Sequence, residues 1–388
     1  MTAPLTAQAP PMLTLGGTPL PLVGRARVYA CGITPYDVTH LGHAATFVWT
    51  DALSRVLQSA GTEPAVCRNV TDVDDVLLAA AGRAGAPYDR FAAIQQFGFD
   101  QDMAALGVRP PALQPRAHAF IGQVIALASG LLARGAAYQR AGRVYFRGRG
   151  VAAAAGLGEQ AALARAAEYG DAPGDPGRDH PSDVPVWLCS RDGEPAWDSP
   201  WGPGRPGWHA ECAAMALDAF GPAVDIQAGG ADLRFPHHAY QAAMAQALTG
   251  VQPFARSAFG VGVVHVAGAK MAKSARNLVL VSELLARYPA AAVRLLILDR
   301  RWDRDWEYTP AALEAAAARL ERLQSAAGRP DHHPGGPAGP PGAGTGPAAL
   351  AAVRAALAAD LDVPGALAIA EEAGGQAARV LVGILGLC

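Results

Sequence analysis

Two histidines in the motif His40-Leu41-Gly42-His43 are spaced to bind a phosphate group. The motif follows a buried, strand-like segment and opens a stretch with helical periodicity. A helix N-terminus offers free N–H groups and a positive dipole end to anions, and Gly42 permits close approach of the backbone. Taken alone, the motif fits equally well two histidines in an ordinary turn.

A second motif, Lys270-Met271-Ala272-Lys273-Ser274, places two lysines within five residues of a chain in which most cations are arginine. Mobile ammonium groups suit the charge that develops on departing pyrophosphate. By itself the stretch could be a solvated loop. Together with the histidine motif about 230 residues earlier, it resembles the paired signature of class I aminoacyl-tRNA synthetases.

A third group of residues has the chemistry of a metal site. Cys31 ends the first strand-like segment, Cys212 lies in the sequence GWHAEC, and His237 and His238 lie in FPHH. Thiolate and imidazole groups suit Zn²⁺, and three protein ligands would leave one tetrahedral position open to a substrate. Spacing alone leaves a different interpretation open, in which the cysteines are structural and the histidine pair lies at the surface.

Longer segments around these residues resemble a known family. They are CGITPYDVTHLGH (31–43), NVTDVDD (69–75), EPAWDSPWGPGRPGWHAEC (194–212), GGADLRFPHH (229–238) and KMAKS (270–274). This set, in this order, resembles cysteinyl-tRNA synthetases. It resembles still more closely their shortened relatives, the mycothiol-pathway ligases that join cysteine to 1D-myo-inosityl 2-amino-2-deoxy-α-D-glucopyranoside (GlcN-Ins). The resemblance covers about residues 25–325 and, more weakly, the C-terminal helices.

Several details favour the ligase over the tRNA enzyme. The sequence CGITPYD at 31–37 matches the ligase, whereas the tRNA enzymes usually read CGPTVYD. Gln241 stands four residues after His237, where the tRNA enzymes carry a zinc-binding Glu. The chain ends at Cys388, where a tRNA enzyme would continue into an anticodon-binding domain. The stretch EYGDAP at 168–173 also resembles a degraded form of the ligase's ERGGDP.

Other details depart from both patterns. Ala272 replaces the middle Ser of KMSKS, but both lysines remain, so we expect activation to be retained. The stretch His238-Ala239-Tyr240 and residues 299–308 are also unusual. These differences bear on the identity of the acceptor more than on cysteine activation.

The resemblance implies a role for each site residue. It implies one Zn²⁺ per chain, held by Cys31, Cys212 and His237, with His238 in a packing or supporting position. It implies catalytic contacts to the phosphates of ATP, accompanied by Mg²⁺, from His40, His43, Lys270 and Lys273. It implies that cysteine, ATP and the adenylate are lined by Gly32, Thr34, Thr46, Asn69, Thr71, Trp208, Gly230, Asp232 and Val264.

The expected reaction is the ATP-dependent activation of L-cysteine to cysteinyl-adenylate and its transfer to the amine of GlcN-Ins. Three alternatives stay open: a ligase with another small amine acceptor, a short cysteinyl-tRNA synthetase, and a non-catalytic synthetase-like regulator. The last should have lost one of the motifs, and this chain keeps them all. For Asp72, Asp74 and Asp75 we predict capping or structural pairing, and the acceptor of the amine's proton is left unassigned.

The predicted fold is α/β: a class I synthetase Rossmann-type parallel sheet, with an inserted helical subdomain and a C-terminal helical domain. Strands are expected near residues 27–32, 63–70, 144–146, 224–227 and 257–266, and helices near 42–60, 90–140 and 309–327, the last capped by Thr309. One or two helices should close the chain, interrupted at Pro364-Gly365. The expected divisions are an extended arm 1–24, sheet halves 25–110 and 186–265, an insertion 111–185, a loop region 266–308, and a helical domain 309–388 with a linker at 328–347.

The net charge, the cysteine content and the distribution of apolar residues bear on the class of protein and its location. The net charge of −2 and the absence of a Lys/Arg run lower the expectation of a large tRNA footprint. Five scattered cysteines do not form a disulfide framework and fit a reducing compartment. No apolar run reaches the ~18–20 residues of a membrane span, and the N-terminus lacks a charged signal-peptide start. We therefore expect a soluble cytoplasmic protein, a monomer or weak homodimer, that acts on small molecules.

Overall fold

The computed structural model describes residues 12–272, 275–331 and 346–388. Lys273, most of the predicted linker and the start of the predicted arm lie outside the described residues. Within the described ranges, no helix combines the length and the apolar character that a bilayer span requires.

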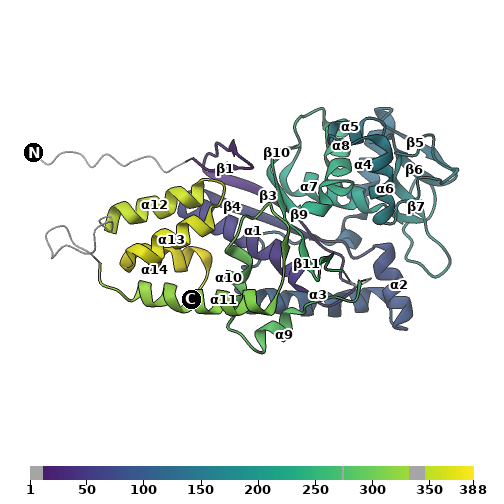
Figure 1. Ribbon diagram of the computed structural model, residues 1–388. Helices are drawn as coiled ribbons and strands as arrows, with labels where there is room; N and C mark the ends of the chain where they lie inside the picture. Colours follow the sequence, from purple (N-terminus) through teal and green to yellow (C-terminus); the bar gives the residue numbers. More distant parts are fainter. Residues whose placement is uncertain (1–11, 273–274, 332–345) are drawn as a thin grey trace, which may run out of the picture.

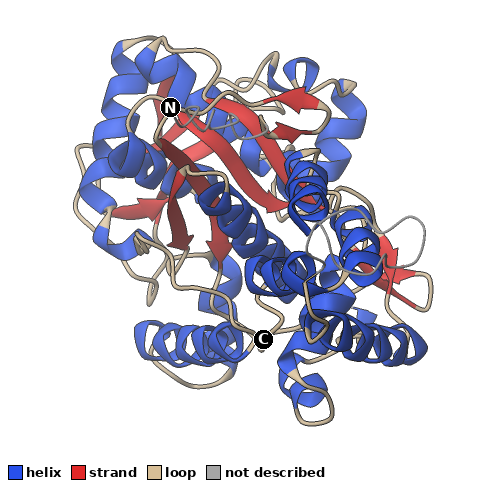
Figure 2. Cartoon of the chain, turned by 90° about the vertical axis from the view of Figure 1, so that its left-hand side faces the viewer, coloured by secondary structure: helices blue, strands red, loops and turns tan. Residues whose placement is uncertain are grey.

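A four-stranded parallel sheet forms the centre of the molecule (Figure 2). Its strands lie in the order β10 (Ala255–Val261), β9 (Val224–Gly230), β3 (Arg25–Ile33) and β4 (Glu63–Val70), and each neighbouring pair is parallel. Strands β3, β4 and β9 are largely buried, as expected when helices cover both faces. The predicted parallel α/β sheet is therefore confirmed, and its strands lie close to the predicted positions.

The alternation of side chains along β3 sends its residues to two different cores. Ala26, Val28 and Ala30 pack in the core that contains α1 (Leu41–Ser59). Tyr29 and Cys31 point to the opposite face and pack with α7 (Trp208–Phe220). Since successive strand residues face opposite sides of a sheet, the position of Cys31 in the strand decides that it meets α7.

The inserted segment folds as a separate unit at the upper right of Figure 1. Before it come α2 (Asp75–Arg83) and α3 (Tyr88–Ala105), which lie lower in Figure 1, and α3 packs with its Phe99 and Met103 in the core that contains α1. The helices and strands of the inserted unit are α4 (Ile121–Ala133), β5 (Ala137–Arg140), β6 (Arg143–Phe146), α5 (Val151–Ala154), α6 (Glu159–Glu168), β7 (Val184–Cys189) and β8 (Gly204–Pro206). Strands β5 to β8 form an antiparallel sheet over a core of their own, to which α4 and α8 (His237–Thr249) contribute. The strand predicted near residues 144–146 is β6, but the other three strands of this sheet were not predicted within the helical subdomain, because short, Pro- and Gly-flanked strands carry little periodicity. The predicted boundary at residue 185 falls inside β7.

The chain then passes through β11 (Val264–Val266), β12 (Ala269–Lys270), α9 (Val281–Leu285), α10 (Ala290–Leu298) and β13 (Trp306–Glu307) into a helical cluster. That cluster consists of α11 (Pro310–Ala327), α12 (Gly346–Ala358), α13 (Val363–Ala373) and α14 (Gly375–Leu385), at the left of Figure 1. Thr309 caps α11 by accepting the N–H of Ala312 at 3.2 Å, as predicted.

Two predictions about the chain ends need correction. Three helices, rather than one or two, lie between residues 346 and 388. The turn between the first two of them contains Asp360 and Leu361, which both have positive φ. Pro364 instead lies in the first turn of α13, where a missing N–H costs no hydrogen bond. Residues 14–19 form a hairpin, β1 (Thr14–Leu15) with β2 (Thr18–Pro19), rather than an extended arm, and the N–H of Gly16 donates to Asp360.

A buried ion pair joins the sheet domain to the C-terminal helices. Arg294 is 1% exposed and donates to Asp51 at 2.8 Å and to the carbonyl oxygens of Leu385 and Leu106. Arg294→Met would leave a buried carboxylate and two carbonyl groups without this donor. We expect a loss of about 3 kcal/mol in the free energy of unfolding, measured by urea denaturation.

The matched control is Arg109→Met, which removes a second and more exposed partner of the same Asp51. Its loss should be below about 1 kcal/mol, because a solvated guanidinium contributes little. Equal losses in the two variants would contradict the stabilising role assigned to Arg294.

Candidate active site

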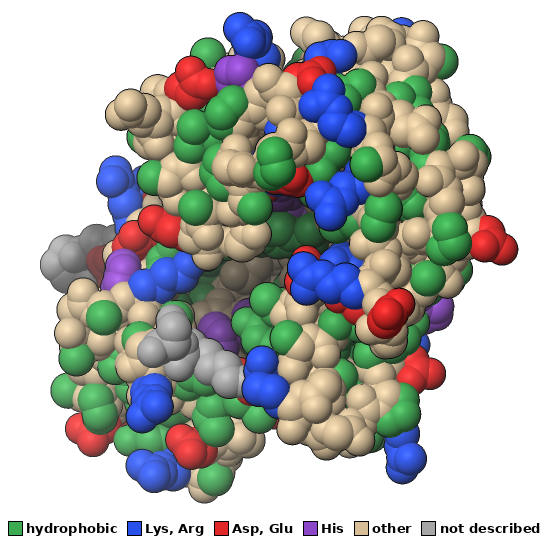
Figure 3. Space-filling model, turned by 90° about the vertical axis from the view of Figure 1, so that its right-hand side faces the viewer, with side chains coloured by type: hydrophobic (Ala, Val, Ile, Leu, Met, Phe, Trp, Pro, Cys, Tyr) green, Lys and Arg blue, Asp and Glu red, His purple; other side chains and the backbone are tan. Residues whose placement is uncertain are grey.

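A cavity of about 660 Å³ opens where the parallel strands end. Its walls include the last residues of β3, β4, β9 and β10, which is where open α/β sheets bind ligands. Figure 3 shows this face hollowed at its centre, with Lys and Arg side chains beside the hollow. The structure brings every described residue of the predicted site to this cavity: Cys31, Gly32, Thr34, His40, His43, Thr46, Asn69, Thr71, Trp208, Cys212, Gly230, Asp232, His237, Val264 and Lys270. Lys273 lies outside the described residues.

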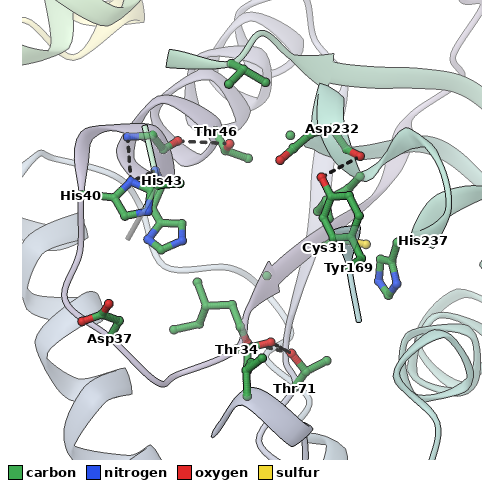
Figure 4. A pocket seen from close by; sticks show the side chains of 18 of the residues that line it. Cys31, Thr34, Asp37, His40, His43, Thr46, Thr71, Tyr169, Asp232 and His237 are labelled. Atoms are coloured by element: carbon green, nitrogen blue, oxygen red, sulfur yellow. Dashed lines mark hydrogen bonds between the residues drawn. The ribbon is translucent and has the colours of Figure 1, made fainter. Parts of the chain in front are cut away.

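Cys31, Cys212 and His237 converge from three separate elements at the base of the cavity. Cys31 comes from β3, Cys212 from α7 and His237 from the start of α8. One ligand atom of each lies within 4.8 Å of the other two, and all three residues are buried. Figure 4 shows Cys31 and His237 directed toward the same space. Two sulfur atoms and one imidazole nitrogen at this separation match the donor set of a zinc site with an open position.

Neighbouring side chains hold these three residues in place. Nδ1 of His209 lies 2.9 Å from Nδ1 of His237, which leaves Nε2 of His237 for the cluster. The amide of Asn69 donates to Sγ of Cys212 at 3.2 Å. Such outer contacts orient metal ligands and fix the imidazole tautomer. His209 was not predicted from the sequence, where it is one more residue of the GWHAEC motif.

Gln241 and Trp208 complete the surroundings of the cluster. Gln241 is fully buried and donates from Nε2 to Sγ of Cys31 at 3.4 Å, so the residue that replaces the expected Glu serves as a donor to sulfur. The ring of Trp208 stacks on that of His237, with centroids 4.1 Å apart. His238 lies outside the cluster and packs against Gly229, consistent with the packing role predicted for it.

Burial and charge also suit the cluster to a metal ion. Burial lowers the pKa of His237, so its imidazole is neutral and can act as a ligand. Burial raises the pKa of the Cys31 thiol, but the Cys212 thiol and the imidazoles of His238 and His237 outweigh it, so this pKa lies well below its ordinary value. The residues present therefore fit a thiolate-binding metal.

His40 acts as the N-cap of α1. Its Nδ1 accepts the N–H groups of Gly42 at 3.1 Å and His43 at 3.4 Å, and the two imidazole rings stack with centroids 3.9 Å apart. A Cβ on residue 42 would lie 3.0 Å from the His40 ring, so glycine makes room for this cap. The sequence analysis expected free N–H groups at this helix start, but His40 occupies two of them, and both imidazoles line the cavity.

Both imidazoles are neutral at ordinary pH. Burial lowers the pKa of His40 to about 4, and burial together with His40 lowers the pKa of His43 to about 3. An unfolded histidine titrates near pH 6.5, so the unfolded chain binds more protons than the folded chain below that pH. The contribution of these groups to stability is therefore complete above pH 6.5 and is lost as the pH falls toward 4 and 3.

We expect the urea midpoint of the protein to fall as the pH is lowered from 7 to 4.5. The fall should be smaller in His43→Gln, which removes one of the groups that must take up a proton on unfolding. An identical pH dependence in the two proteins would contradict the neutral state assigned to His43.

Lys270 and Asp232 both line the cavity, and their side chains form an ion pair there. Nζ of Lys270 lies 2.5 Å from Oδ2 of Asp232, and Lys270 lowers the pKa of that carboxyl although burial opposes it. The hydroxyl of Tyr169 donates to the backbone oxygen of Asp232 at 3.2 Å (Figure 4). The ring of Tyr169 also stacks on that of Trp208. Tyr169 thus links the insertion to the side of the cavity that holds Asp232 and Lys270, and the sequence analysis noted only the EYGDAP stretch in which it lies.

Gly32 was predicted to line the ligand site, but the packing of the two neighbouring strands also explains why this residue is glycine. A Cβ on Gly32 would lie 1.7 Å from the carbonyl oxygen of Asn69, so the close approach of β3 and β4 requires glycine there. Thr34 and Thr71 share a hydroxyl hydrogen bond of 2.7 Å on the cavity wall (Figure 4). Thr46 and Val264 line the cavity from α1 and β11.

Comparisons with known proteins agree with this geometry. Residues 22–318 match the family described as tRNA synthetases class I (C) catalytic domain. The L-cysteine:1D-myo-inositol 2-amino-2-deoxy-alpha-D-glucopyranoside ligase of Parafrankia sp. is 45% identical over 352 residues, covering 88% of this chain and 76% of the relative. The corresponding ligase of Catenulispora acidiphila is 43% identical, covering 89% and 81%.

Solved structures show the same fold at lower identity. Methionyl-tRNA synthetase of Mycobacterium tuberculosis, in complex with methionyl-adenylate, superposes with a TM-score of 0.65 at 18% identity, covering 94% of this chain and 82% of that protein. The chain therefore belongs to the class I (C) tRNA synthetase catalytic-domain family and, within it, to the family of L-cysteine:1D-myo-inositol 2-amino-2-deoxy-alpha-D-glucopyranoside ligases.

Proposed function

We propose that this protein uses ATP to activate L-cysteine as cysteinyl-adenylate and transfers the cysteinyl group to the amine of GlcN-Ins, releasing AMP and pyrophosphate. One observation carries the proposal. The Cys31–Cys212–His237 cluster lies in the same cavity as the histidine motif and the Lys270–Asp232 pair. This supports the proposal, in which a thiol-selective pocket and a nucleotide site would share one space. Membership of the ligase family supports the choice of acceptor.

The thiol of the substrate would occupy the space in front of the cluster, beneath Trp208. A zinc ion held there would supply a Lewis-acid position that takes a thiolate in preference to a hydroxyl, which separates cysteine from serine. Trp208 closes one wall by stacking on His237, and Thr34 and Thr71 present hydroxyl groups for the polar end of the amino acid. The chain thus positions the carboxylate while the cluster selects the side chain.

ATP would lie across the strand ends between the histidine motif and Lys270. Asp232 is placed to accept hydrogen bonds from ribose hydroxyls, and the neutral imidazoles of His40 and His43 can donate to phosphate oxygens. Lys270 is half-exposed and can turn from Asp232 to the phosphates. Attack of the cysteine carboxylate on the α-phosphorus then needs positioning and charge stabilisation, without a covalent enzyme intermediate. Lys273 and Mg²⁺ belong to this same step in the proposal.

Cysteine-dependent exchange of labelled pyrophosphate into ATP tests the activation step. We expect exchange with cysteine and a rate lower by several orders of magnitude with serine, because a hydroxyl cannot replace the metal-bound thiolate. Equal exchange with both amino acids would contradict a thiol-selective metal in the pocket.

A further inference from the structure

Three aspartates follow β4 beside the cavity, and the carboxylates of two of them pair with side chains of other segments. The carboxylate of Asp72 accepts the backbone N–H of His118 at 3.0 Å and lies 2.5 Å from its ring Nδ1. Asp75 is exposed and pairs with Arg205 at 2.5 Å. These contacts fasten the end of β4 to the insertion, in agreement with the structural roles predicted for both.

Asp74 differs from its two neighbours. Its Oδ1 caps α2 by accepting the N–H of Val76 at 2.8 Å, as predicted. Among residues 12–272, 275–331 and 346–388, its other oxygen has no hydrogen-bond partner. It is also the one of the three aspartates that lines the cavity, together with Thr34, Thr71 and Trp208.

A second carboxyl lies behind Asp74 without a partner. Glu211, on α7, is 1% exposed, and neither of its carboxylate oxygens has a hydrogen-bond partner in the part of the chain that the structure describes. Burial raises its pKa well above the ordinary value, and the charges that add most to this are Asp74 and Asp72. Buried polar groups without partners are rare and call for an explanation. Of these two carboxyl groups, only that of Asp74 lines the cavity, so a donor that enters the cavity can reach Asp74.

The second step of the proposed reaction brings such a donor. An amine acceptor arrives largely as an ammonium ion, which has three N–H donors and no lone pair for attack. A carboxylate at the cavity wall can bind the ammonium through a charge-assisted hydrogen bond and can also accept its proton. Asp72 and Asp75 are not placed to do this, because neither of them lines the cavity.

We propose that the free oxygen of Asp74 binds the ammonium group of the acceptor and takes one proton from it before the amide bond forms. This inference rests on the proposed function. The nitrogen lone pair then attacks the carbonyl carbon of cysteinyl-adenylate, and the bond from that carbon to the phosphate oxygen breaks with its electron pair leaving on AMP. The second proton, carried by nitrogen after the attack, leaves on the AMP phosphate.

The surroundings of Asp74 suit a base that works near neutral pH. Burial raises the pKa of Asp74 to about 6, the N–H of Val76 and the cation of Arg205 lower it, and Asp75 raises it. Glu211 on α7 and Asp72 in the same loop are the other acidic groups of this region. Above pH 6 the carboxylate form therefore predominates and can accept a proton.

The variant Asp74→Asn tests this role, because asparagine caps a helix as well as aspartate does and α2 should stay folded. In single-turnover experiments with enzyme-bound cysteinyl-adenylate, transfer to GlcN-Ins should slow by about 100-fold at pH 7. Cysteine-dependent pyrophosphate exchange should continue at the wild-type rate. The remaining transfer rate should rise with pH as free amine becomes available, whereas the wild-type rate should level off above pH 6.

Two comparisons sharpen the test. Asp75→Asn, which changes the adjacent carboxylate outside the cavity, should keep the wild-type transfer rate. Hydroxylamine, whose nitrogen is already unprotonated at pH 7, should accept the cysteinyl group equally well from Asp74→Asn and from the wild type. Wild-type transfer by Asp74→Asn, or loss of exchange together with transfer, would overturn the inference. Absence of cysteine-dependent exchange in the wild-type protein would instead contradict the proposed function itself.

Discussion

Cys212→Ser should abolish both metal binding and cysteine activation. Sγ of Cys212 is one of three ligand atoms in the buried cluster, and a serine hydroxyl is a poor ligand for a metal that prefers thiolate. Loss of a residue that only hydrogen-bonds to a metal ligand typically lowers metal affinity by about 10–100-fold. Loss of a ligand itself should therefore lower the affinity by more than about 100-fold. Elemental analysis of the purified variant and pyrophosphate exchange with cysteine measure the two effects.

Cys67→Ser is the matched control. Cys67 is as fully buried as Cys212 and packs in the same core, but it lies outside the metal-binding cluster. Its replacement should lower stability and leave the zinc content unchanged. A Cys212→Ser protein that retained one zinc per chain would refute the metal site.

Lys270→Met should slow adenylate formation by about 10²–10³-fold, the usual cost of removing one preorganised group that stabilises transition-state charge. Lys270 is the lysine of the KMAKS motif that the structure describes; it lines the cavity, and its ammonium group pairs with Asp232. The loss should appear in the rate constant of adenylate formation more than in the KM for cysteine, because the thiol pocket is untouched. Rapid-quench measurement of adenylate formation separates these two parameters.

Arg276→Met supplies the control for this loop. Arg276 is exposed, belongs to the same stretch and does not line the cavity. Its replacement removes one positive charge from the loop without removing a group that faces the phosphates, so activation should stay close to the wild-type rate. Equal losses in Lys270→Met and Arg276→Met would indicate a general charge effect instead of a specific contact.

Much of the central fold could be predicted from the sequence, because the elements that carry it have strong local signals. The apolar runs of β3, β4 and β9 lie between clear turn residues, and Thr309-Pro310 marks the start of α11. The antiparallel sheet of the insertion was missed because β7 and β8 lie in stretches rich in Pro and Gly. The hairpin at residues 14–19 was also missed, although Gly16-Gly17 is a favoured two-residue hairpin turn, and the N–H of Gly16 adds a tertiary contact with Asp360.

The site was predictable in its residues more than in its geometry. Resemblance brought together Cys31 and Cys212, which lie 181 positions apart, and the alternation of β3 shows physically why they meet. Sequence spacing could not show that His40 would cap its own helix, or that His209 would hold His237 through Nδ1. Both contacts depend on side-chain orientations that are settled only by packing.

The most direct test of the proposed ligase is AMP release by the purified protein with ATP and cysteine, with GlcN-Ins or tRNA added in parallel. The proposal predicts that GlcN-Ins stimulates AMP release and that mass spectrometry finds a new cysteinyl amide of the amino sugar, while tRNA has no effect. Stimulation by tRNA, with cysteine attached to its 3′ end, would contradict the proposal and make this protein a short tRNA synthetase.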